Sequence, residues 1–250
     1  MAPVLVVLIV GQLTEWGIVP GNSGDGDGAP PTPTTAGSNL PAQAPFTVAV
    51  QEWQDPCGAG WIVPRRSGQF APPPPLDQKW EPWAKSVAGV PALMHYVYFT
   101  VQGRSASQVT LTDLRVRVVQ RRPALPGTHV FAGCGGPTVF RWVSVDLDQK
   151  PPAAQTHYDR IFASDAPAQE RRPIKFPYRV TLSEAETFAV VGNAKQCDCL
   201  WEVDLDWASE GRTGTYTIRS TSGQPFRTTG DARVYAVCGP SSPSPPVACR

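Results

Sequence analysis

The sequence predicts an all-β protein: a disulfide-stapled β-sandwich, immunoglobulin-like or related, with one short helix, preceded by an N-terminal hydrophobic segment and a disordered linker. Three observations predict this fold class. Apolar residues alternate with polar residues in many short segments, which is the period of a half-buried strand. The sequence has no long apolar stripe of 3.6-residue period, and its 28 Pro and 22 Gly supply frequent turns. Short strands with turn-rich connections favour a sandwich or barrel over a parallel α/β sheet.

Residues 1–19 are predicted to be a hydrophobic anchor or export segment. Residues 4–10 (VLVVLIV) form an unbroken apolar run. This run is shorter than the roughly 20 residues that span a bilayer, and no basic residue precedes it as in a signal peptide. A buried strand or an N-terminal tail is the alternative. We favour the membrane interpretation because a low-complexity segment follows directly.

Residues 20–45 are predicted to be a disordered linker rich in Gly, Pro and Thr. Such a segment buries too little apolar surface to offset its chain entropy. It would act as a stalk that holds the folded domain, predicted over 46–238, away from a surface. Residues 239–250 are expected to form a Pro/Ser-rich C-terminal tail.

Alternation predicts strands around 46–50, 143–147, 174–180 and 215–218, and a central strand over 94–101. One strand changes phase, because Val109 and Leu111 share a parity that Leu114 does not. A β-bulge near Thr112 or Asp113 would keep both sets facing inward. Residues 82–88 are predicted to form a short helix, with Pro in its first turn and Gly89 just past its end.

The segment 196–207 (QCDCLWEVDLDW) places its odd-numbered residues on the core side of a strand. These residues are Cys197, Cys199, Trp201, Val203, Leu205 and Trp207. We expect the two cysteines to bond distant partners rather than each other, because an extended backbone separates them. Cys57 and Cys134, both in Gly-rich turns, are the natural partners, and the pairing stays open.

Cys238 and Cys249 could close a C-terminal loop. A zinc site is the rival interpretation of the cysteines, but the paired spacing of structural zinc sites is absent. No metal and no cofactor are therefore predicted.

Glu202, Asp204 and Asp206 point to the opposite side of the same strand. If the strand that carries Asp146 and Asp148 were its neighbour, five carboxylates could hold a cation. The favoured alternative is a solvated acidic face balanced by two arginines on another strand. Those arginines are Arg115 and Arg117.

Three tryptophans are candidate ligand-binding residues. Trp80 and Trp83 flank a Pro-rich segment, and Trp142 shares a side with carboxylates. An exposed aromatic ring near carboxylates is typical of a sugar-binding surface. The favoured alternative is that the Pro-rich segment covers Trp142 as a second small core.

Catalytic chemistry is not indicated by any motif. His95, His129 and His157 lie outside metalloprotease and nucleophile-elbow patterns, so no catalytic residue and no enzyme activity are predicted. The net charge of +1 also disfavours nucleic acid as a partner.

The segment CDCLWEVDLDWASEGRTGTYTI, followed by GQPFRTTG, resembles the end of an uncharacterised family of actinobacterial membrane-anchored envelope proteins. CGAGWIVP, VQGRSASQVTLTDLRVRVVQR and GCGG are its other marks, so the resemblance covers about residues 46–230. It implies a transmembrane segment, a Pro/Thr linker and an extracytoplasmic β domain.

The sequence thus predicts a non-catalytic binding or sensing module of the cell envelope, tethered to the plasma membrane and facing outside, or secreted. Its partners would be the lipid membrane, through the N-terminal segment, and an envelope protein or polysaccharide. The alternatives are a carbohydrate-binding module and a hydrolase that uses the surface carboxylates, with Asp204 and Asp206 as candidates.

Overall fold

The computed structural model describes residues 43–54, 56, 59–75, 77–132, 141–158, 172–240 and 247–249. These residues belong to one compact unit, Gln43–Arg250. The predicted hydrophobic segment over 1–19 lies outside the described residues, as does nearly all of the predicted linker over 20–45. Among the described residues, no helix is long and apolar enough to cross a membrane. The described fold is mostly β, with one short helix.

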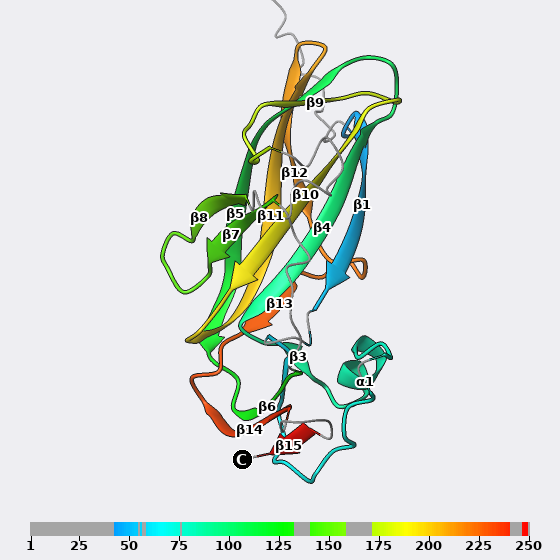
Figure 1. Ribbon diagram of the computed structural model, residues 1–250. Coiled ribbons are helices and arrows are strands. Elements are labelled where there is room, and N and C mark those ends of the chain that lie inside the picture. The colour runs from blue at the N-terminus through cyan, green and yellow to red at the C-terminus, as the bar shows by residue number, and fades with distance from the viewer. Residues whose placement is uncertain are drawn as a thin grey trace, which may run out of the picture. The chain divides into compact units, whose positions relative to one another are not determined.

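Sheet I has five strands in the order β1–β4–β10–β7–β8 (Figure 1). The strands are β1 (Phe46–Trp53), β4 (Met94–Gly103), β10 (Ala185–Asn193), β7 (Arg141–Asp146) and β8 (Ala153–Tyr158). Neighbouring strands are antiparallel, except that β10 and β7 run parallel. The predicted central strand is β4, which is hydrogen-bonded on both edges.

Sheet II has the order β12–β11–β5–β9, and β13 also pairs with β11. Its strands are β12 (Arg212–Ile218), β11 (Cys197–Ser209), β5 (Val109–Pro123), β9 (Tyr178–Val180) and β13 (Phe226–Thr229). The long antiparallel pair of β11 and β5 forms its centre. The edge strand β9 begins just after Pro177, and a proline, which has no N–H to donate to a ladder, is tolerated beside an edge strand.

Sheets I and II share one hydrophobic core. The odd-numbered residues of 197–207 all face it, as their alternation predicted, and each is at most 4% exposed. Gly192 of β10 lies against Trp201, because a Cβ at this glycine would be 2.6 Å from the indole Cζ2. Only glycine therefore lets the largest fully buried side chain of sheet II reach sheet I.

The phase change of β5 is a β-bulge, as the sequence predicted. The register between β11 and β5 shifts between Asp206 and Trp207, which leaves Thr112 as the extra residue. A second shift makes Val119 the extra residue of another bulge, and its side chain is 41% exposed. The two bulges keep the apolar residues of both strand segments on the core side.

Sheet III is a small sheet in the order β15–β14–β6–β2–β3. Its strands are β15 (Val247–Cys249), β14 (Val234–Pro240), β6 (Gly127–Val130), β2 (Trp61–Val63) and β3 (Val90–Pro91). The helix α1 (Glu81–Ser86) has Pro82 in its first turn and overlaps the predicted helix over 82–88. The segment 239–250, expected to be only a tail, contains the end of β14 and all of β15.

Candidate functional site

A polar hollow lies on the outer face of sheet I, between the ends of β7, β8 and β10. Its volume is about 350 Å³. The residues that line it are Ser144, Asp146, Asp148, Gln149, Ala153, Gln155, Asn193 and Lys195. All but Ala153 carry a hydrogen-bonding side chain, so the hollow suits a ligand rich in hydroxyl or amide groups.

An aromatic stack borders this hollow. Trp142 precedes Ser144 by two residues on β7 and therefore shares its face of the sheet. Its partner across the ladder is His157 of β8, and the two rings stack with centroids 5.1 Å apart and planes 12° apart. Two residues along a strand span about 7 Å, so the stack and the hollow form one continuous surface. Both rings are half-buried.

Hydrogen bonds hold the lining of the hollow in place. The amide nitrogen of Asn193 donates to Ser144 Oγ at 2.8 Å and to the carbonyl of Val145 at 3.2 Å. Gln149 Nε2 donates to Asp146 Oδ2 at 2.9 Å. Because the partners of the Asn193 nitrogen are acceptors, its Oδ1 is the atom that can accept a bond from a ligand.

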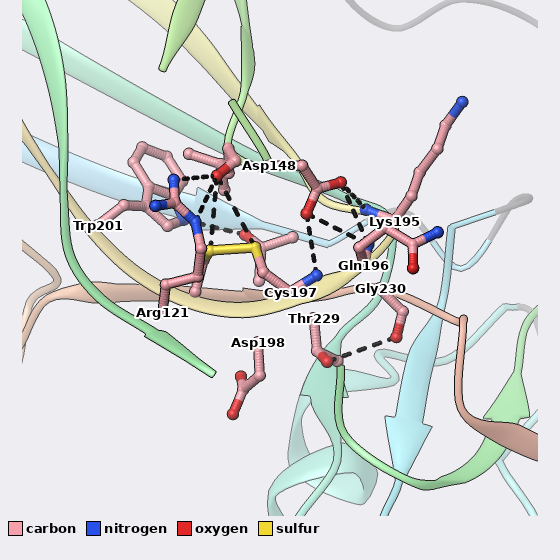
Figure 2. The surroundings of a disulfide bond; sticks show 12 residues. Arg121, Asp148, Lys195, Gln196, Cys197, Asp198, Trp201, Thr229 and Gly230 are labelled. Atoms are coloured by element: carbon pink, nitrogen blue, oxygen red, sulfur yellow. Dashed lines mark hydrogen bonds between the residues drawn. A yellow bond between two sulfur atoms is a disulfide. The ribbon is translucent and has the colours of Figure 1, made fainter. Parts of the chain in front are cut away.

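Asp148 joins the turn after β7 to the turn before β11. Figure 2 shows its carboxylate accepting hydrogen bonds from three consecutive backbone N–H groups. The distances are 2.7 Å from Lys195 to Oδ2, 3.1 Å from Gln196 to Oδ2 and 2.9 Å from Cys197 to Oδ1. A carboxylate that accepts several backbone N–H groups orders the turn, so Asp148 fixes one wall of the hollow.

Cys197 and Cys199 are bonded to each other. The expectation that each cysteine reaches a distant partner such as Cys57 or Cys134 was therefore wrong. It assumed a regular strand, in which residues two apart lie about 6.6 Å apart. Here the two Cα atoms are 5.4 Å apart, inside the usual range for a disulfide, because the backbone at the start of β11 is contracted.

The disulfide supports the hollow from the core side. Both cysteines are buried, and their sulfur atoms lie 3.9 and 3.7 Å from the carbonyl oxygen of Leu147. Arg121 donates to the same oxygen at 2.6 Å and to the carbonyl of Gln149 at 2.8 Å. The turn that carries Asp148 is thus held by the Arg121 guanidinium and by backbone N–H groups, and it packs on the buried disulfide.

The remaining cysteines are only partly described. Cys57 and Cys134 lie outside the described residues. Cys238 of β14 is buried and disulfide-bonded, and its position in the ladder is opposite Cys249 of β15. That Cys238 and Cys249 close a C-terminal loop stays a prediction, and the antiparallel pairing of β14 with β15 places the two residues opposite each other.

The outward carboxylates of β11 each face an arginine. Arg115 donates two hydrogen bonds to Asp206, and this contact lowers the pKa of Asp206 below its ordinary value. Arg117 donates to Asp204 at 3.1 Å. The predicted balance between these two arginines and the acidic row of β11, which consists of Glu202, Asp204 and Asp206, is confirmed. Asp204 and Asp206 are therefore engaged in ion pairs rather than available as free carboxylates.

Glu202 is the buried member of the row, with a side chain only 4% exposed. It accepts from Arg117 at 2.7 Å and from Arg219 at 2.6 Å. Asp146 and Asp148 belong to sheet I and its turn, whereas the acidic row belongs to sheet II. The five carboxylates considered together in the sequence do not share one site.

Trp80 and Trp83 are buried, so the prediction that they form an exposed sugar-binding surface was wrong. Both pack on Trp61 of β2, with ring centroids 5.8 and 6.2 Å away, in a second small core. Trp83 Nε1 also donates to the carbonyl of Ala71 at 2.8 Å. The Pro-rich segment thus covers Trp61 rather than Trp142.

A second hollow, of about 470 Å³, lies where the end of sheet I meets α1. Glu52, Gln54 and His95 border it, and Nε2 of His95 is 3.6 Å from Oε2 of Glu52. Burial lowers the pKa of His95 to about 4, so this histidine is neutral at pH 7. Burial also raises the pKa of Glu52.

Sequence reasoning missed several residues of both hollows. His157 and Gln155 of β8 pair with Trp142 and Ser144 of β7, and Asn193 of β10 pairs with Asp146, so only the register between strands assembles this surface. A local signal existed for Glu52, because it stands on the side of β1 that carries Val48 and Val50. A charged residue in the apolar phase of a strand is a departure that often marks a site.

The described residues contain no group of three or more His, Cys, Asp or Glu side chains arranged to hold a metal ion. Comparison of the chain with protein-family models and with curated proteins finds no match to either.

Proposed function

We propose that this protein is a non-catalytic binding module of the cell envelope, tethered to the plasma membrane or secreted, and that its ligand is a polysaccharide. It would bind through the outer face of an immunoglobulin-like β-sandwich formed by sheets I and II. The observation that carries this proposal is the continuous surface made by the Trp142–His157 stack and the polar hollow beside it.

The chemistry of this surface matches a sugar. Sugar rings have apolar C–H faces, which pack on aromatic rings, and a rim of hydroxyl groups, which need donors and acceptors. The stack supplies aromatic surface, and Gln155, Asn193 and Lys195 supply amide and ammonium groups about one or two sugar units away.

Two features support the proposed location outside the cytoplasm. Cys197 and Cys199 form a disulfide, and Cys238 is disulfide-bonded as well. Disulfides persist in oxidising compartments and are rare where thiols are kept reduced. The apolar run over 4–10 supports tethering or export.

The hydrolase alternative has less support. It relied on the carboxylates of β11, and Asp204 and Asp206 are held in ion pairs with Arg117 and Arg115. A carboxylate that serves as general acid or nucleophile must be able to reach the substrate, and these pairings hold both carboxylates against β5.

The test is binding of the purified protein to insoluble cell-wall polysaccharide, measured by co-sedimentation. Trp142→Ala should reduce binding by about tenfold or more, because it removes the aromatic surface. Gln155→Ala should weaken binding through the hollow alone.

Tyr235→Ala is the matched control, because this exposed aromatic residue lies on sheet III, away from sheet I. Binding that survives Trp142→Ala and Gln155→Ala unchanged, in variants with wild-type circular dichroism, would contradict the proposal.

A further inference from the structure

The strand β1 forms one edge of sheet I in the described part of the chain. It is eight residues long, and it pairs with β4 in a continuous register without a bulge. Natural edge strands are usually protected from pairing with another chain by proline, lysine, a bulge or a very short length. The edge strand β9 of sheet II, for example, has three residues and follows Pro177. β1 (FTVAVQEW) has none of these features and is therefore an unprotected edge.

The backbone groups that point out from this edge follow from the register. The N–H of Arg104 donates to the carbonyl of Pro45 at 3.0 Å, so Pro45 stands at a hydrogen-bonded position of the ladder with β4. Because such positions alternate, the N–H and C=O groups of Val48 and Val50 point away from β4. The carbonyl of Phe46 points the same way, and it accepts from Nε of Arg104 at 3.1 Å. A side chain thus covers the start of the edge, and the next outward groups can pair with another strand.

The side chains along this edge are apolar. Val48 and Val50 pack against the core from β1 but are only partly buried. Ala49 lies between them on the other side of the strand and is exposed. Phe46 contacts Tyr216 of the edge strand β12, with ring centroids 5.5 Å apart, and Tyr216 is 37% exposed. Apolar surface is therefore open along the side of the sandwich where β1 and β12 lie.

A second copy of the chain fits this edge because β1 is complementary to itself. In a two-fold antiparallel pair centred on Ala49, Val48 lies opposite Val50 of the other copy, and the reverse holds for the other pair. The valines then meet on the core side, and their outward N–H and C=O groups bond across the pair. Thr47 lies opposite Gln51, so no like charges face each other.

We propose that the chain forms a dimer by antiparallel pairing of β1 with β1 of a second copy, so that sheet I continues from one copy into the other. One strand pair makes a smaller interface than the roughly 1,200–2,000 Å² of stable complexes, so the dimer is expected to dissociate at low micromolar concentrations. The two-fold axis is perpendicular to the sheet, so both polar hollows face the same direction and one polysaccharide could reach both. That consequence rests on the proposed sugar binding, whereas the dimer itself does not.

The test is analytical ultracentrifugation of the full chain, without polysaccharide, at concentrations from about 10 μM to about 1 mM. The wild type should change from monomer to dimer over this range. Ala49→Lys and Ala49→Glu should each weaken the dimer by about tenfold or more, because two like charges then meet at its centre. An equimolar mixture of the two variants should restore the dimer, because each lysine then faces a glutamate.

The central pair also predicts a covalent cross-link. Ala49 would stand at a non-hydrogen-bonded position relative to the second copy, where facing Cα atoms are about 4.5 Å apart. This separation lies in the range that a disulfide bridges. Ala49→Cys should therefore give a cross-linked dimer in oxidised glutathione, detected by non-reducing gel electrophoresis and mass mapping.

Ala154 is the matched control, because it is an exposed alanine on β8, the opposite edge strand of sheet I. Ala154→Lys should leave the dimer unchanged, and Ala154→Cys should not give the cross-link. A folded wild-type chain that stays monomeric up to about 1 mM would overturn the proposal, even if the edge binds an extended segment of another protein. Association that survives both Ala49→Lys and Ala49→Glu, or that Ala154→Lys weakens equally, would overturn it as well.

Discussion

His95 gives the fold a pH dependence whose size follows from its surroundings. The imidazole packs edge-on against Trp201 and Phe226, with ring centroids 6.2 and 6.3 Å away, and burial lowers its pKa from 6.5 to about 4. Between these values the unfolded chain binds a proton that the folded chain does not, so the free energy of unfolding rises with pH. The difference between these two pKa values corresponds to about 3 kcal/mol of unfolding free energy. This contribution to stability is present above pH 6.5 and is lost as the pH falls through about 4.

The titration of Glu52 changes the free energy of unfolding in the opposite direction to that of His95. The effect of His95 is therefore best measured in a protein that lacks the Glu52 carboxylate. Burial raises its pKa above the ordinary 4.5, so the folded chain keeps a proton that the unfolded chain has released. Its contribution is therefore present at low pH and is lost as the pH rises through the raised value. The comparison should use Glu52→Gln as the reference and the double variant Glu52→Gln/His95→Gln as the test.

The assay is urea unfolding followed by tryptophan fluorescence at about pH 7 and about pH 4, with an NMR titration of the imidazole. The reference should lose about 3 kcal/mol more on acidification than the double variant, since glutamine does not titrate. Equal losses in the two proteins, or an imidazole pKa at or above 6.5, would refute the reasoning.

Three further predictions concern the wall of the polar hollow on sheet I and the acidic row of β11. Mass mapping of unreduced protein should find Cys197 and Cys199 bonded within one peptide, and a bond from either to another segment would contradict the structure. This bridge closes only a three-residue loop, which limits its chain-entropy contribution to about 1.6 kcal/mol. Asp148→Asn should lower the free energy of unfolding by about 2–3 kcal/mol in urea, because three backbone N–H groups lose their carboxylate, and a loss under about 0.5 kcal/mol would argue against this role. Glu202→Gln should cost about 1–3 kcal/mol and Asp206→Asn under about 1 kcal/mol, because their side chains are 4% and 23% exposed, so equal losses in urea unfolding would be unexpected.

Alternation was informative wherever one face of a strand is buried. It predicted the core side of β11 and the bulge at Thr112, because a one-residue error in either would expose a whole row of apolar side chains. It also predicted that Arg115 and Arg117 would balance the acidic row. In each of these cases the residues concerned lie in one or two short segments. The side of the strand that each residue occupies then follows from whether its number is odd or even.

The failures have a different physical origin. Parity gives the side of a strand but not its local length, so the contraction that joins Cys197 to Cys199 was invisible. Trp80 and Trp83 stand in a Pro-rich segment that resembles exposed loop, and nothing nearby shows that Trp61 will supply a surface for them. These contacts depend on which distant segments meet, which a single sequence does not encode locally.

The candidate sites were only partly foreseen for the same reason. Trp142 was identified as a ligand-binding candidate from its side of the strand, but His157 joins it through the pairing of β7 with β8. Glu52 and His95 likewise come together at the end of sheet I only through the pairing of β1 with β4, which leaves Nε2 of His95 3.6 Å from Oε2 of Glu52. Tertiary register creates both surfaces, so pattern reasoning can name single members and not the whole set.

The order of strands in sheet III affects how the protein can fold during synthesis. β6 lies between β2, made early, and β14, which begins at Val234, so one edge of β6 stays open until the ribosome has made most of the chain. Pairings between such distant segments are slow to form, and an open strand edge invites association with other chains. Nascent chains truncated before β14 should therefore depend on chaperones far more than the finished protein does.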